Sequence, residues 1–175
     1  MRKILSLICY LFLLSACTSL PDVIKNIPVI DVPYGVVAKD ASTYKNKQVR
    51  WGGVIIQTET EKELSFVQIL FYPLDSSGYP LLNQEPEGRF IIASTDFLDP
   101  AIYTKDRVIT VAGMLNGGVE RSIGNKKISI PLLLTKAIYL WPKDYRKSYI
   151  SDGRYPYFYY PFFYPGYYGP YRYWR

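Results

Sequence analysis

Val49-Arg50-Trp51-Gly52-Gly53-Val54-Ile55-Ile56-Gln57 is rich in β-branched and aromatic residues, and this composition favours a β-strand. Its Gly52-Gly53 pair predicts a bulge or a sharp bend, which would help a sheet to curl. Charged residues at 59–63 predict a turn, and residues 64–72 then show partial alternation of apolar and polar side chains. We therefore expect these two segments to pair as an antiparallel hairpin.

Four further strands are expected, over residues 89–94, 107–115, 128–134 and 137–141. Asn116-Gly117-Gly118 is expected to end the second of these, and Pro131 predicts an edge or a bulge in the third. One short helix is expected within residues 36–44, where Asp40 and Ser42 offer capping groups. About six strands with turns between them predict an all-β fold, a small OB-like closed barrel or a sandwich, because closure removes exposed strand edges.

The first residues carry an export pattern. Arg2-Lys3, an apolar run from Ile4 to Leu14 and the small pair Ser15-Ala16 precede Cys17. The apolar run is too short to span ~30 Å of hydrocarbon as a helix. A cysteine directly after small residues predicts a lipoprotein signal peptide over residues 1–16, cleaved between Ala16 and Cys17. An ordinary signal peptide with a coincidental cysteine and an uncleaved anchor helix are the alternatives.

Cys17 is then expected to carry N-acyl and diacylglyceryl groups that anchor the mature chain in lipid. Three prolines predict an extended, lipidated tether over residues 17–35 that lets the domain stand off the membrane. The barrel domain is expected over residues 36–145.

Residues 146–175 form an irregular tail rich in Tyr, Pro and Phe. Its closely spaced prolines exclude a helix or a central strand. Three interpretations stay open: an uncommitted end, a segment that docks on an envelope protein or polysaccharide, and a segment that lies at the bilayer interface.

Composition excludes several function classes. The chain has no histidine, and neither of its two cysteines, Cys9 in the signal peptide and lipidated Cys17, is left for a disulfide, a metal site or catalysis. We therefore expect no catalytic residue, no metal and no cofactor. The formal net charge of +6 falls to about +4 when Arg2 and Lys3 leave with the signal peptide. An excess of this size suits anionic envelope surfaces better than nucleic acid, so no nucleic-acid partner is expected.

Polar residues that could carry chemistry have structural interpretations. A glycosidase-like carboxylate pair is conceivable, but each acidic residue sits beside turn formers: Asp75, Glu85, Glu87, Asp96 and Asp99. The serines considered as nucleophiles lack an elbow motif and a histidine partner: Ser76, Ser77 and Ser122. The glycines lack phosphate-loop spacing and fit a bulge and turns instead: Gly113, Gly117, Gly118 and Gly124.

Large and cationic strand residues are weighed in the same way. Trp51 and Trp141 are expected to pack in the core rather than to form ligand platforms. Arg50 and Arg89 are expected to be exposed cations on opposite strand faces, either contacting an anion or solvated.

The chain resembles the Slp/YeaY family of outer-membrane lipoproteins, the starvation-inducible lipoprotein group, over roughly residues 1–142. The resembling pieces are Leu14 to Cys17, Val49-Arg50-Trp51-Gly52-Gly53, Pro73 to Pro80, Glu87-Gly88-Arg89-Phe90, Phe97-Leu98-Asp99-Pro100, Val108 to Gly113 and Tyr139-Leu140-Trp141-Pro142. The tail departs from this pattern. The resemblance implies an outer-membrane lipid anchor and an association with starvation or stress, without an established activity or defined binding residues.

We therefore expect a non-enzymatic lipoprotein of the outer membrane, facing the periplasm, with a structural or stress-related envelope role. Thr18 after Cys17, where Asp marks inner-membrane retention, favours the outer membrane. The alternative is a binding module for glycan, lipopolysaccharide or a small ligand, since OB-like barrels often bind through one face. An enzyme is the least favoured class.

Overall fold

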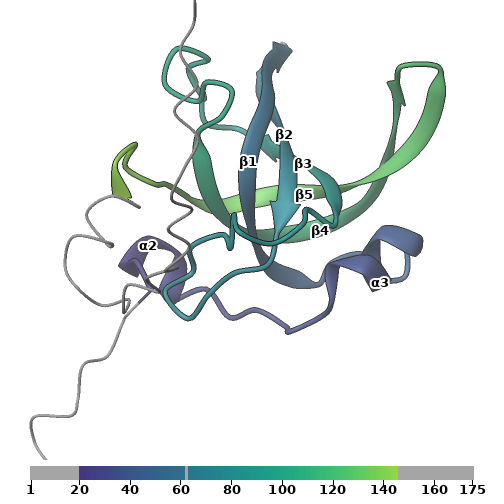
Figure 1. Ribbon diagram of the computed structural model, residues 1–175. Coiled ribbons are helices and arrows are strands. Elements are labelled where there is room, and N and C mark those ends of the chain that lie inside the picture. Colours follow the sequence, from purple (N-terminus) through teal and green to yellow (C-terminus); the bar gives the residue numbers. More distant parts are fainter. Residues whose placement is uncertain (1–19, 62, 146–175) are drawn as a thin grey trace, which may run out of the picture. The chain divides into compact units, whose positions relative to one another are not determined.

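The computed structural model describes residues 20–61 and 63–145 of the 175-residue chain. Ala16, Cys17 and the tail of residues 146–175 lie outside this described part. Five strands close into a barrel in the order β1-β2-β3-β5-β4 (Figure 1). They are β1 Gln48–Glu61, β2 Leu64–Tyr72, β3 Gly88–Ser94, β4 Val108–Ile123 and β5 Lys126–Leu140. The neighbouring strands pair antiparallel, except for the parallel pair β3–β5. The expected all-β, OB-like closed barrel is confirmed.

The expectation of about six strands is corrected to five, because the break expected between residues 134 and 137 is a bulge: Ala112 pairs with Ala137 and Gly113 with Thr135, so β5 holds one extra residue. The break expected at residues 116–118 is a bulge as well. Leu115 pairs with Leu133 and Gly118 with Pro131, so β4 holds one extra residue and continues to Ile123. Asn116-Gly117-Gly118 therefore does not end the strand, and Pro131 does mark a bulge. Segments 128–134 and 137–141 are one strand, β5. A bulge absorbs the extra residue and bends the strand without ending the ladder.

The far ends of β4 and β5 form a two-stranded arm, residues 118–129, that extends beyond the rest of the barrel (Figure 1). Gly124 has a φ of 57° in the turn of this arm, and Gly117 has a φ of 80° in the β4 bulge. Glycine takes such positive φ values at no steric cost. Together with Gly113 at the second register shift of the β4–β5 ladder, these positions confirm that the glycines serve bulges and turns.

The β1–β2 hairpin is confirmed, with a register from Gly52 opposite Tyr72 to Glu61 opposite Leu64. Of the bulge or sharp bend expected at Gly52-Gly53, the bulge is wrong, because the register shift of β1 falls between Ile55 and Gln57. The glycines are needed for close packing instead. A Cβ atom on Gly53 would overlap the carbonyl oxygen of Leu70, and one on Gly52 would lie 2.9 Å from the carbonyl oxygen of Ile109.

The barrel interior is filled by apolar side chains. Trp51 is 4% exposed and meets the rings of Phe71 and Phe90 edge-on, at centroid distances of 5.7 and 5.4 Å. Trp141 is 2% exposed, and its Nε1 donates to the hydroxyl oxygen of Thr110 at 2.9 Å. Both tryptophans are core residues, as expected, and the hydroxyl of Thr110 supplies the partner that a buried indole N–H needs.

Between residue 20 and the first strand, the structure describes two short helices: α2 Asp22–Lys25 and α3 Tyr34–Lys39. The helix expected within residues 36–44 exists but begins two residues earlier, directly after Pro33. It ends at Lys39, because the Asp40 carboxylate accepts hydrogen bonds from the backbone N–H groups of Ser42 and Thr43, at 3.1 and 3.3 Å. Asp40 therefore stabilises the turn after the helix rather than its start.

Residues 20–33 differ from the extended tether expected for residues 17–35. Ile24 of α2 is fully buried, and the backbone N–H of Ile30 donates to the carbonyl oxygen of Gln48 at 2.8 Å. Burial of Ile24 stabilises a packed arrangement of this segment over a solvated one.

Candidate binding cavity

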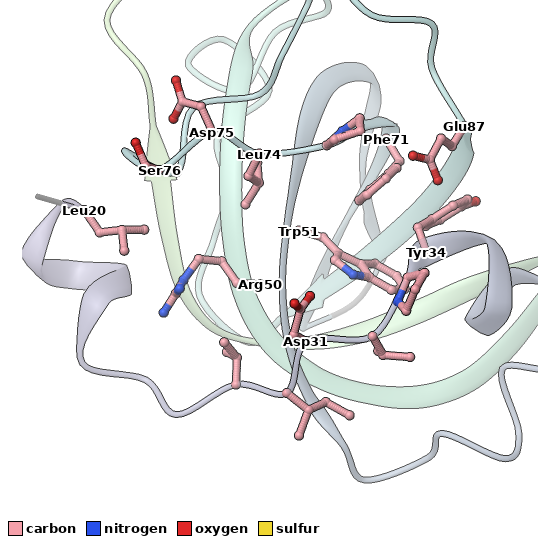
Figure 2. A pocket seen from close by; sticks show the side chains of 16 residues that line it. Leu20, Asp31, Tyr34, Arg50, Trp51, Phe71, Leu74, Asp75, Ser76 and Glu87 are labelled. Atoms are coloured by element: carbon pink, nitrogen blue, oxygen red, sulfur yellow. The ribbon is translucent and has the colours of Figure 1, made fainter. Parts of the chain in front are cut away.

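A cavity of about 540 Å³ lies between the N-terminal segment, β1 and the loop of residues 73–87 that follows β2 (Figure 2). Three aromatic side chains gather on one side of it, and Leu20 and Arg50 lie on the other. The aromatic residues are Tyr34, Trp51 and Phe71. All three belong to the barrel core and are only 4–6% exposed, and polar side chains line much of the remaining wall. The size of the cavity is typical of small-ligand sites.

The aromatic wall is held in place by ring contacts. Tyr34 stacks on Phe71 with a centroid distance of 4.3 Å and an interplanar angle of 13°. It also meets Trp51 edge-on at 5.2 Å. Leu74 adds an aliphatic surface, since its Cδ2 atom lies only 2.7 Å from where a Cβ atom on Gly52 would be. The glycine of β1 therefore makes room for a residue that lines the cavity.

Tyr34 is tied to the barrel through its hydroxyl group. Its Oη atom donates to the carbonyl oxygen of Arg89 at 2.7 Å. Burial raises the pKa of Tyr34 to about 12, and nearby Glu87 adds to the rise, although the hydrogen bond to Arg89 acts in the opposite direction. The phenol is therefore a neutral hydrogen-bond donor at physiological pH.

Arg50 is not the exposed, solvated or anion-contacting cation that was expected. Its Nε and Nη2 atoms donate to the carbonyl oxygen of Ile24 at 3.1 and 2.7 Å, and Nη2 also lies 3.3 Å from the carbonyl oxygen of Ile27. These carbonyls belong to the last turn of α2 and the residues after it, where backbone acceptors lack helical partners. Burial lowers the pKa of the half-buried guanidinium, which nevertheless stays charged at neutral pH. Arg89, also half-buried, contributes its backbone carbonyl to Tyr34.

The carboxylates confirm their expected turn roles where the structure shows their contacts. Asp75 accepts from the backbone N–H and the hydroxyl of Ser77 at 2.8 and 2.6 Å, and from the N–H of Tyr79 at 2.9 Å. Asp99 accepts from the N–H of Ala101 at 2.8 Å.

Of the acidic and serine candidates, the cavity brings together Asp75, Ser76 and Glu87, and the others lie elsewhere: Ser77, Glu85, Asp96, Asp99 and Ser122. Ser77 is buried behind Asp75 and bonded to it. Ser122 lies on the arm.

Sequence reasoning missed Leu20, Asp31 and Tyr34 as cavity residues. All three lie in residues 17–35, which were expected to form an extended tether without contact to the barrel. The one sequence feature that points to packing is the set of apolar residues interspersed among the prolines of residues 20–33.

The described residues show neither a metal-binding cluster nor a membrane-spanning helix. In residues 20–61 and 63–145, no group of three or more Cys, Asp or Glu side chains is placed to hold a metal ion. Within the same ranges, no helix combines the length and the apolar character that crossing a membrane requires.

Several known proteins are similar to this chain. The outer membrane protein Slp of Escherichia coli K12 is 33% identical over 61% of this chain and 57% of its own length. The uncharacterized lipoprotein YeaY of the same organism is 29% identical over 66% of this chain and 60% of its own length. An uncharacterized protein of Haemophilus influenzae is 28% identical over 68% and 65%. The chain thus matches less than two thirds of the length of these relatives.

Weak similarities to solved structures are found as well. They include OBody NL8 bound to hen egg-white lysozyme, at 12% identity with a TM-score of 0.36 over 55% of this chain and 97% of that chain. A second is the mitochondrial single-stranded DNA binding protein Rim1 of S. cerevisiae, at 16% identity with a TM-score of 0.34 over 53% and 91%. At these scores neither similarity bears on the fold or the function of this chain.

The family assignment rests on a longer match. The sequence profile of the outer membrane lipoprotein Slp family matches residues 14–173. This match begins at the proposed lipidation motif and includes most of the tail, so it extends beyond the resemblance over residues 1–142. It covers most of the chain, which therefore belongs to the outer membrane lipoprotein Slp family.

Proposed function

We propose that the protein is a lipid-anchored lipoprotein of the outer membrane, attached through acylated Cys17 after cleavage behind Ala16 and facing the periplasm. Membership of the Slp family supports the outer-membrane location. The sequence Leu14-Ser15-Ala16-Cys17 behind an apolar run supports the lipid anchor. The role proposed for it is structural or stress-related and is exerted through contacts with other envelope components.

The proposed role involves no catalysis. The chain has no histidine to act as a general base near neutral pH. Asp75, the most enclosed carboxylate of the cavity, already accepts three hydrogen bonds from its own turn. Its function there is explained by the loop conformation without any chemistry.

The cavity favours the second candidate function, an envelope binding module for glycan, lipopolysaccharide or a small ligand. The observation that carries it is the cavity of about 540 Å³ itself, which Leu20, Leu74 and the edge of the aromatic core line together with Asp31 and Glu87. Apolar surface with a few polar groups around it can bind the apolar part of a ligand and orient its polar groups.

Photo-crosslinking in intact envelopes separates a contact through the cavity from a contact through the tail. A photoreactive residue at Leu74 reports on the cavity, and one at Ile128, an exposed position on the arm, is the matched control. The same probes are placed in chains with and without residues 151–175. A product at Leu74 that survives loss of the tail supports the binding module. If every crosslinked product disappears when the tail is removed, the protein makes its contact through the tail and the cavity takes no part in it.

A further inference from the structure

The cavity lies close to the proposed point of lipid attachment in the chain. Leu20, the first described residue, lines it. Three residue steps separate Leu20 from Cys17, and an extended chain spans at most about 3.6 Å per step, so the two lie within about 11 Å. The headgroup region on each side of a bilayer is about 5–8 Å thick. An acylated Cys17 would therefore hold this end of the barrel against the leaflet.

The N-terminal segment is fixed to the barrel shortly after Leu20. Arg50 fixes the carbonyls of Ile24 and Ile27, and Ile24 is fully buried. Val23 and Ile30, on the same segment, leave 52% and 42% of their surface exposed. Apolar side chains exposed next to a lipid anchor favour contact with a bilayer over contact with water.

The charges around the cavity favour one kind of lipid. Among the described residues that line it, Arg50 is the single cation, and its guanidinium is engaged by backbone carbonyls. Asp31 and Glu87 contribute exposed carboxylates beside the aromatic wall. Anionic headgroups would meet these carboxylates unfavourably, whereas an ammonium group would be attracted to them.

We propose that the cavity takes a zwitterionic phospholipid with an ammonium headgroup from the leaflet that holds Cys17, its apolar part against Leu20 and Leu74 and its ammonium group near Asp31 and Glu87. The source of the ligand rests on the proposed anchor at Cys17. The chemistry of the site rests on the cavity itself.

Lipid photo-crosslinking tests the proposal with the whole mature lipoprotein. The protein is reconstituted in vesicles that hold equal amounts of phosphatidylethanolamine and phosphatidylglycerol, with a photoreactive residue at Leu74 or, in case that variant fails to fold, at Leu20. We expect phosphatidylethanolamine adducts to exceed phosphatidylglycerol adducts by about threefold, as two weak charge contacts would give. A probe at Ile128 on the arm should give few adducts of either lipid.

Charge variants test the headgroup preference. Asp31→Asn with Glu87→Gln should bring the two adducts to parity, whereas Glu120→Gln, an exposed carboxylate on the arm, should leave the preference unchanged. Equal labelling of both lipids in the unaltered protein, or equal labelling at Leu74 and Ile128, would overturn the proposal.

A second measurement separates this proposal from the anchor. Sedimentation with the vesicles reports on anchorage, so a protein that sediments without lipid adducts at Leu74 keeps its anchor and loses the proposed site. If the protein does not sediment, dihexanoyl phosphatidylethanolamine below its micelle concentration is titrated while tryptophan fluorescence is recorded. Saturable binding that exceeds that of dihexanoyl phosphatidylglycerol then supports the site alone, and its absence overturns it.

Discussion

The guanidinium of Arg50 on β1 donates two hydrogen bonds to the carbonyl oxygen of Ile24 on α2, at 3.1 and 2.7 Å. The two residues are 26 positions apart, so this contact ties the N-terminal segment to the barrel wall. A guanidinium is a rigid planar group that can donate to several carbonyls at once in fixed directions. A lysine ammonium sits on a flexible chain and does not fix these directions. One side chain thus holds the N-terminal segment, which lines part of the cavity.

Arg50→Met is expected to loosen this segment while the barrel stays folded. Hydrogen bonds to a charged donor contribute about 1.5–3 kcal/mol each in favourable cases, and Arg50 is only half-buried, so we expect a total loss of about 1–3 kcal/mol. Hydrogen exchange should increase at the N–H groups of residues 22–30. Arg121→Met on the arm is the control, and equal exchange in the two variants would show that Arg50 does not hold the segment.

Tyr34 is expected to make stability depend on alkaline pH. Its pKa is about 12 in the folded protein against an ordinary value of 10.0, so the folded state favours the neutral phenol. The contribution is fully present below pH 10 and is lost as the pH rises from 10 towards 12. The melting temperature should therefore fall over this window.

Tyr34→Phe should flatten that pH dependence. It should also cost about 1 kcal/mol at neutral pH, because the carbonyl of Arg89 loses its donor. Tyr44→Phe, at a partly buried position packed against the core, is the comparison. If the melting temperature of Tyr34→Phe still falls steeply above pH 10, groups other than Tyr34 cause the alkaline loss of stability.

The sequence predicts a feature of this fold well when the residues that determine the feature are close together in the chain. Alternation and β-branched composition located part of each of the five strands, because these features act within a strand, but they missed residues 116–123 of β4. Asn116-Gly117-Gly118 was expected to end β4, yet the ladder to β5 continues past it through a bulge. Whether glycine ends a strand or permits a bulge is decided by the partner strand, and local sequence does not contain that information.

The candidate site was less predictable for the same reason. Arg50 resembles any strand cation in the sequence, and its role depends on carbonyls more than 20 residues away. Asp75, in contrast, acts within its own turn, and its capping role was predicted correctly from Asp75-Ser76-Ser77-Gly78. Contacts within a few residues were predictable, whereas those that depend on the N-terminal segment folding back were not.

Gly53→Ala is expected to destabilise the barrel strongly. Its Cβ atom would overlap the backbone carbonyl of Leu70, and a strand backbone cannot move without disturbing its ladder. We expect a loss of at least about 2 kcal/mol. Gly35→Ala in α3 is the matched control, because nothing lies within 4 Å of its Cβ position, and alanine should stabilise this helix by up to about 1 kcal/mol. Urea unfolding measures both, and similar midpoints would contradict the packing assigned to Gly53.

Cys17→Ser is expected to release the protein from the membrane. Acyl chains contribute about 0.8 kcal/mol per buried CH₂ group, and the described residues contain no helix suited to span a bilayer. Labelling with palmitate and membrane fractionation after a salt wash measure the effect. A serine variant that still sediments and carries label would refute the lipid anchor. Recovery of the unaltered protein in the inner-membrane fraction of a density gradient would refute the outer-membrane sorting expected from Thr18.

Removal of residues 151–175 is expected to leave the barrel folded. The last strand ends at Leu140, and Trp141 closes the core with its indole bonded to Thr110. The closely spaced prolines of the tail cannot extend the β-ladder. A chain that ends at Ile150 should therefore lose less than about 1 kcal/mol of stability. Since 1 kcal/mol shifts the melting temperature of a small domain by ~4–8 °C, the melting temperature should change by only a few degrees.

The same truncation is expected to remove an envelope contact. Tyr and Phe rings offer a large contact area with little side-chain entropy to lose, and Arg154, Arg172 and Arg175 add cations that can stack on aromatic groups or pair with anionic headgroups. Crosslinking in intact envelopes should therefore lose products when residues 151–175 are removed. A fall in melting temperature of more than about 10 °C would instead show that the tail packs against the core. Unchanged melting with unchanged crosslinks would show that it makes no contact of its own.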